Sequence, residues 1–158
     1  FVSTLQKAPM KPFALLALCA AAFAALPASA QFARPEDAVK YRPGALTVMG
    51  THFFRIGAMA SGRAPYDAKA ALENAQVVAD MARLPWAGFG PGTDKMSPKA
   101  KPEIWTEQAK FKDLSEKMAA ETVNLLAAAK TNNLDNLKKA FASTNAACKA
   151  CHDSYRGN

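Results

Sequence analysis

Two thiols and an imidazole stand together near the end of the chain, in the stretch CKACHDSYR that runs from Cys148 to Arg156. A pair of cysteines three residues apart could form a redox couple, half of a zinc site or a disulfide. If the segment is helical, Cys148 and His152 share a face because they are four residues apart, and Cys151 lies at the edge of that face. All three side chains could then reach one flat group lying along the helix.

Covalent attachment of haem is the chemistry that gives each of these three residues a separate task. Cys148 and Cys151 would form thioether bonds to one edge of the haem, and His152 would coordinate the iron. Structural zinc needs four ligands, and the only further candidate after residue 30 is the distant His52. A thioredoxin-like dithiol normally lies at the start of a helix that follows a strand, whereas this pair lies near the end of the last predicted helix. A disulfide within one helical turn is sterically poor. The pattern therefore favours one covalently bound haem c.

The elements that must position these residues are helices, because apolar residues recur at alternating spacings of three and four. The predicted helices cover residues 35–60, 67–84, 102–129 and 134–155. Asp67 is a suitable N-cap for the second helix, and Pro43 should kink the first by removing a backbone hydrogen bond to Val39. The Gly- and Pro-rich residues 86–102 form a long loop. The predicted fold is all-α, an antiparallel four-helix bundle with this loop between its second and third helices.

The first 30 residues differ in composition from the rest of the 158-residue chain. They hold no acidic residue, and the apolar run over residues 13–26, preceded by lysines and followed by Ala-Ser-Ala ending at Ala30, predicts a signal peptide cleaved at that point. Residues 1–9 could be spurious upstream translation. The run is too short to span a membrane. We therefore expect an exported protein with one domain, residues 31–158.

The formal net charge of +7 is modest, and the basic residues are spread along the predicted helices without forming a basic run. Two of the lysines belong to the predicted signal peptide. Nucleic-acid binding is therefore not expected.

Four stretches together resemble cytochrome c prime, the class II c-type cytochrome of the bacterial periplasm. They are CKACHDSYR on the last helix, LPWAGFGPGT in the loop, PEIW at the start of the third helix and QFARPEDAVKYR after the signal. The resemblance covers essentially all of residues 31–158. It implies a four-helix bundle, often a homodimer, that carries one high-spin, five-coordinate haem.

The resemblance assigns roles around the last helix. Cys148 and Cys151 correspond to the thioether cysteines, and His152 corresponds to the sole axial ligand. Arg156 corresponds to a cation beside the imidazole, where it would weaken the bond between iron and His152. The alternative for Arg156 is a solvated residue favoured by the helix dipole. For Tyr155, which the resemblance also places in contact with the haem, core packing is favoured over chemistry.

On the opposite face, Leu46 corresponds to the apolar residue over the vacant position of the iron, and it has no lone pair with which to ligate. Low-spin relatives carry a methionine near this level; Met49 is the nearest candidate, although core packing is favoured for it. His52 falls off the apolar stripe, which favours a surface or helix-packing role. Trp86 and Phe89 correspond to aromatic residues of the haem pocket, or else plug the end of the bundle.

The resemblance also predicts contacts to the edge of the haem. Arg42 corresponds to a residue that binds a haem propionate, for which its guanidinium is well shaped; the alternative is a solvent-facing arginine. Many members have Gln or Glu at the next position, but this chain has Pro43, which donates no hydrogen bond. The loop looks slightly longer than in close relatives over residues 95–101, and either Thr93 or Asp94 is a further expected contact.

Two functions follow from a haem with one histidine and an open apolar face. An electron carrier would cycle between Fe(II) and Fe(III) against redox partner proteins or a quinol-pathway donor. A gas-binding protein would sequester or sense NO, or bind CO. Peroxidase activity is disfavoured because Leu46, and not a histidine–arginine pair, occupies the distal position; an enzyme is not expected.

Overall fold

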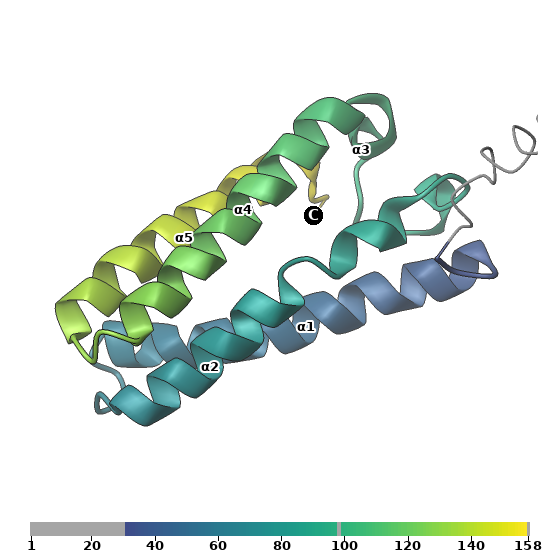
Figure 1. Ribbon diagram of the computed structural model, residues 1–158. Helices are drawn as coiled ribbons and strands as arrows, with labels where there is room; N and C mark the ends of the chain where they lie inside the picture. Colours follow the sequence, from purple (N-terminus) through teal and green to yellow (C-terminus); the bar gives the residue numbers. More distant parts are fainter. Residues whose placement is uncertain (1–30, 98, 158) are drawn as a thin grey trace, which may run out of the picture. The chain divides into compact units, whose positions relative to one another are not determined.

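The computed structural model describes residues 31–97 and 99–157, so the predicted signal peptide lies outside the described residues. Four long helices and one short helix make up this part of the chain: α1 (Pro35–Ala60), α2 (Ala68–Met81), α3 (Glu103–Thr106), α4 (Gln108–Ala129) and α5 (Leu134–Tyr155). Figure 1 shows α1 beside α2 and α4 beside α5. The described residues contain no strand, only an isolated bridge between Ala100 and Arg156. The predicted all-α bundle is confirmed.

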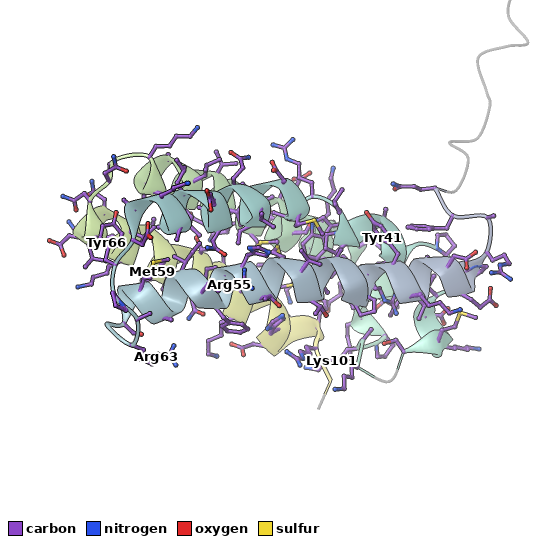
Figure 2. All side chains as sticks on the ribbon, turned by 90° about the horizontal axis from the view of Figure 1, so that it is seen from below. Tyr41, Arg55, Met59, Arg63, Tyr66 and Lys101 are labelled. Carbon is purple, nitrogen blue, oxygen red and sulfur yellow. The ribbon has the colours of Figure 1, made fainter. Side chains whose placement is uncertain are left out.

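Helix α1 has the bounds expected from the sequence and remains helical through Pro43. It begins with Pro35 in its first turn, followed by two acidic residues that interact favourably with the positive end of the helix dipole. Figure 2 shows α1 along its length, with Tyr41 toward one end and Met59 toward the other. Its buried apolar residues, such as Phe53 and Ile56, face the bundle.

The caps of α2 and α5 are set by side chains that precede each helix. The predicted cap is confirmed, since the Asp67 carboxylate accepts a hydrogen bond from the Ala70 amide at 3.0 Å. Asn133 caps α5 in the same way through the amide of Asn136, also at 3.0 Å. Helix α2 ends at Met81, earlier than the predicted residue 84, because the next residues turn toward a short 3-10 helix.

The third predicted helix is not continuous, and this expectation was wrong. Helix α3 ends at Thr106 and α4 begins at Gln108, while Glu107 between them has φ −110° and ψ 41°. The Glu107 carboxylate accepts a hydrogen bond from the Tyr155 hydroxyl at 3.0 Å, and the Trp105 indole donates to the Gly90 carbonyl at 3.2 Å. These contacts with distant segments favour a break that the local helical pattern does not indicate.

The long loop between α2 and α3 contains two 3-10 helices, η2 (Pro85–Phe89) and η3 (Asp94–Met96). Aromatic side chains from the loop, α3, α4 and α5 meet at this end of the bundle, and we call them the aromatic cluster: Trp86, Phe89, Trp105, Phe111 and Tyr155. Phe111 lies at its centre, with ring centroids 5.0 Å from Phe89 and 5.3 Å from Tyr155. No described helix is long and apolar enough to cross a membrane.

Candidate haem site

A cavity of about 910 Å³ lies among α1, the loop, α4 and α5. Its size is that of a pocket for a large organic cofactor. Ten of the eleven residues expected at the haem line it: Arg42, Pro43, Leu46, Trp86, Phe89, Cys148, Cys151, His152, Tyr155 and Arg156. The structure thus gathers residues from α1, the loop and α5 around one space.

The two cysteines form part of the α5 wall and are partly buried, with no disulfide between them. Burial raises the pKa of both thiols, and for Cys151 the neighbouring Cys148 raises it further. Both therefore remain neutral thiols at ordinary pH, one helical turn apart on the same wall. This arrangement suits attachment to two points on one edge of a flat group.

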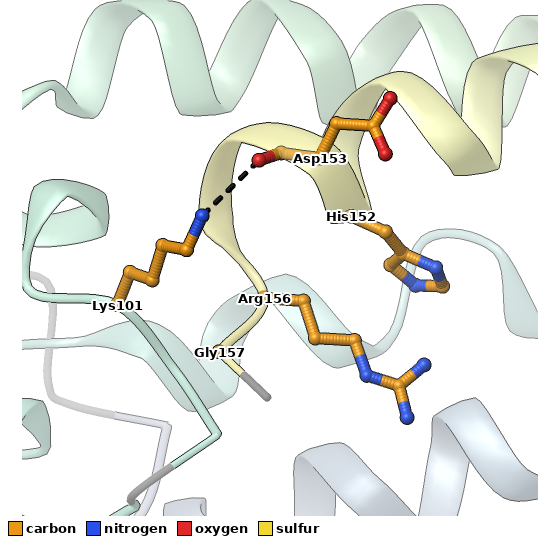
Figure 3. A pocket seen from close by; sticks show the side chains of 5 residues that line it. All are labelled: Lys101, His152, Asp153, Arg156 and Gly157. Carbon is orange, nitrogen blue, oxygen red and sulfur yellow. Dashed lines mark hydrogen bonds between the residues drawn. The ribbon is translucent and has the colours of Figure 1, made fainter.

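His152 lies on the same wall and lines the cavity, where it is partly exposed. Figure 3 shows His152 and Arg156 projecting to the same side of the end of α5, where they also line a smaller pocket of about 470 Å³. Burial lowers the pKa of His152, and the charge of Arg156 lowers it further. The imidazole is thus favoured in its neutral form, the form that binds a metal.

The segment that follows His152 is held against the loop. The Lys101 amide donates to the Tyr155 carbonyl and the Gly157 amide donates to the Lys99 carbonyl, both at 3.0 Å. Lys101 Nζ also donates to the Asp153 carbonyl at 3.1 Å. The last turn of α5 is therefore fixed from the loop side, with its imidazole-bearing face left toward the cavity.

The α1 wall carries the apolar residues. Leu46 is partly buried and Met49 is 8 % exposed, and both line the cavity. His52 does not line it; its Nδ1 lies 2.8 Å from the Asn74 Oδ1 of α2. The residues of α1 that face the cavity near Leu46 thus include no histidine.

Arg42 is buried in the α1 wall with only 3 % of its surface exposed, so the alternative of a solvent-facing arginine is wrong. Its Nη1 donates to the Gly88 carbonyl at 2.8 Å and to Thr93 Oγ1 at 3.3 Å. Its guanidinium lies over the Phe89 ring, 4.4 Å from the centroid. Burial lowers its pKa, yet arginine stays charged in proteins.

The second terminal nitrogen of Arg42, Nη2, is buried and has no hydrogen-bond partner among the described residues. A buried, charged donor without a partner is costly, and a carboxylate is the group that satisfies it best. Thr93 does not line the cavity, because it is 1 % exposed and lies against Arg42. Its placement supports an indirect role, in which it orients the arginine.

Two contributors to this arrangement were not singled out from the sequence, although both stand in the quoted stretches. A side chain at Gly88 would place its Cβ 2.8 Å from the Ala38 carbonyl oxygen and 2.8 Å from the Arg42 Cβ. Only glycine therefore allows η2 to approach α1 this closely. Trp105 adds a second ring near the Arg42 guanidinium, at 5.7 Å.

The donor set and the space fit a haem c. One wall offers two thiols and an imidazole on one helix face, the other offers apolar side chains, and Arg42 offers an unused donor suited to a propionate.

Comparison with known proteins agrees with this site. Residues 37–156 match the Cytochrome C' family. The chain is 49% identical over 126 residues to a cytochrome c' of Alcaligenes xylosoxydans xylosoxydans, an alignment that covers 80% of this chain and 98% of that protein.

Solved structures are similar as well. The crystal structure of cytochrome c' from Rubrivivax gelatinosus has a TM-score of 0.77 and 45% identity, covering 80% of this chain and 100% of that one. A nitric oxide complex of a mutant cytochrome c prime from Alcaligenes xylosoxidans has a TM-score of 0.76 and 47% identity, covering 81% of this chain and 99% of that one. The chain belongs to the cytochrome c' family and is a haem protein of c type.

Proposed function

We propose that the mature chain is a periplasmic electron carrier with one haem c, joined to Cys148 and Cys151 by thioether bonds and ligated axially by His152 alone. When bound, the haem supplies one-electron Fe(II)/Fe(III) chemistry and one open coordination position. The observation that carries this proposal is the division of the cavity, with the thiols and imidazole on α5 and Leu46 on α1 facing the same space.

The remaining residues of the site would bind and orient the haem. Arg42 would donate Nη2 to a propionate, and its other contacts, to Gly88 and Thr93, would hold the guanidinium in place. Arg156 would stand beside the imidazole of His152. Because His152 also lines the smaller pocket at the end of α5, an electron could enter or leave along that side without crossing the bundle. The donor would be a redox protein or a member of a quinol pathway.

A second function is favoured by a specific observation, the nitric oxide complexes of related cytochromes c prime. In this chain Leu46 offers no lone pair to the iron, so the distal side would stay open to an uncharged diatomic such as NO or CO. The chain would then sequester or sense the gas and need no redox partner. We also propose that the chain is exported to the periplasm and forms a homodimer.

The first experiment measures the mass and the optical spectrum of the exported protein. We expect the mass of one haem to remain after denaturation, and the ferrous spectrum to be five-coordinate and to change on addition of CO. Met49→Leu is the matched variant and should leave the spectrum unchanged. Loss of the haem mass would overturn the proposal, and a low-spin ferrous spectrum that Met49→Leu abolishes would replace the open face with methionine ligation.

A second measurement separates the two functions. Stopped-flow reduction by a candidate quinol-pathway donor should be fast if the protein is a carrier. Tight NO binding together with slow reduction by all donors would favour the gas-binding alternative.

A further inference from the structure

The cavity reaches the surface between α1 and α5. Exposed residues of both helices line it, among them Thr47 and Phe54 of α1 and Asn145 and Lys149 of α5. Residues that are exposed and also line the same space mark its mouth. A small molecule could therefore pass between these two helices.

The mouth is closed at the end of the bundle that lies away from the loop. There the rings of Phe53 and Phe141 stack with centroids 4.5 Å apart. A Cβ at Gly57 would lie 2.7 Å from the Phe141 ring, so the two helices are in tight contact at this level. This contact bounds the mouth at one end, whereas exposed lining residues continue past Leu46 to Pro43 on α1 and to the last turn of α5. The interval between the contact and Leu46 is therefore one part of the mouth.

Gly50 occupies this interval, one turn after Leu46, and it lines the cavity while it is only partly buried. A Cβ built there would meet only one neighbouring atom within 4 Å, Cε2 of Phe54 at 3.8 Å. Because Gly50 has no side chain, the α1 wall has a gap at this position, and the ring of Phe54 borders that gap. That ring is 70% exposed, the most exposed of the large apolar side chains described.

We propose that Gly50 and Phe54 form a gate through which small uncharged diatomics reach the distal side of the haem. This proposal rests on the open face at Leu46 proposed above. An exposed ring changes rotamer within picoseconds to nanoseconds, so Phe54 can uncover and cover the gap at Gly50 without movement of the helices. The gate is apolar on the α1 side, which favours NO and CO over ions.

The first test measures CO rebinding to the ferrous haem protein after flash photolysis. Phe54→Ala should raise the association and dissociation rates by the same factor, about fivefold, because a gate changes the barrier and not the bound state. Gly50→Leu should lower both, and Gly50→Ala should do so more weakly while it keeps α1 intact. Val48→Ala is the matched control, because Val48 is an exposed apolar residue of α1 that does not line the cavity.

The second test does not depend on iron. In the iron-free porphyrin form of the same protein, dissolved oxygen quenches the porphyrin triplet at a rate set by gas access. We expect Phe54→Ala to accelerate this quenching, Gly50→Leu to slow it and Val48→Ala to leave it unchanged.

The outcomes distinguish this gate from the proposed open face. If the quenching rate does not change on substitution of Phe54 or Gly50, the gate is overturned, even if CO binds normally. A change in CO affinity with an unchanged dissociation rate also overturns it, because that result indicates an altered bound state. If the ferrous protein binds no CO but the quenching responds as expected, the gate stands and the proposed open face fails.

Discussion

The two walls of the cavity are built in opposite ways. On α5, the residues that can react are close in sequence, and Cys148, Cys151 and His152 are partly buried or exposed. On α1, Arg42 and Met49 are almost wholly buried, and Arg42 takes its hydrogen-bond partners from residues more than 40 positions away. In the proposed haem site, the α5 wall would supply the bonds to the cofactor, whereas the α1 wall would supply shape and one oriented charge.

This difference predicts that substitutions in the two walls have different effects. A change on α5 should remove the cofactor or its attachment and leave much of the bundle intact, because few core contacts are lost. A substitution in η2, where it packs against α1, should instead disrupt packing, because the α1 wall depends on the close approach of these two elements. The following substitutions separate these two kinds of failure.

The largest effect is expected from the α5 wall. In the double variant Cys148→Ser, Cys151→Ser, no thioether bond can form, so the haem should be lost completely on denaturation. Each single variant should keep one covalent bond. Mass spectrometry of the denatured protein measures this directly. Haem mass that persists in the double variant would show that attachment lies elsewhere.

The α1 wall should respond through stability. Gly88→Ala introduces a Cβ that would lie 2.8 Å from the Ala38 carbonyl oxygen, and we expect it to lower the free energy of unfolding by about 2 kcal/mol. Gly44→Ala is the matched control. A Cβ at Gly44 meets nothing within 4 Å inside α1, so this substitution should raise stability by about 0.5–1 kcal/mol. Both values come from denaturant unfolding of the haem protein; equal effects at the two glycines would contradict the close approach.

The same contrast explains what the sequence could predict. The bounds of α1, the cap at Asp67 and the grouping of Cys148 with His152 depend on neighbours within a few residues, and local patterns contain that information. The burial of Arg42 depends on the Gly88 carbonyl and on rings from two further segments. No local pattern indicates which residues such distant segments bring together.

The sequence also failed to predict the break at Glu107, where a residue between α3 and α4 contacts α5. The pattern of apolar residues continues through this position, and the hydrogen bond to Tyr155 is its contact with a distant segment. Sequence reasoning found Tyr155 as a packing residue and did not find its partner. The resulting tether between Glu107, just before α4, and the last turn of α5 can be tested through its charge.

The smallest effect is expected from this tether, and it should depend on pH. Hydrogen bonds from Tyr155 and Lys110 lower the pKa of Glu107, so its contribution to stability is present above the unfolded carboxyl pKa, about 4.3, and is lost as the pH falls through the lower folded value. Burial and the bond to Glu107 raise the pKa of Tyr155 to about 12. Its contribution is present below the unfolded pKa, about 10, and is lost as the pH rises through the folded value.

Thermal unfolding across pH separates these two contributions. Glu107→Gln should reduce the loss of stability on acidification, and Tyr155→Phe should reduce the loss at alkaline pH. Glu116→Gln is the matched control, because Glu116 lies on α4, the helix that follows the break, and pairs with the exposed Lys112, four residues before it. If the Glu107 and Glu116 variants have the same acid profile, the carboxylate at the break does not hold the end of α5. The α5 wall would then depend on its cofactor and the loop contacts alone.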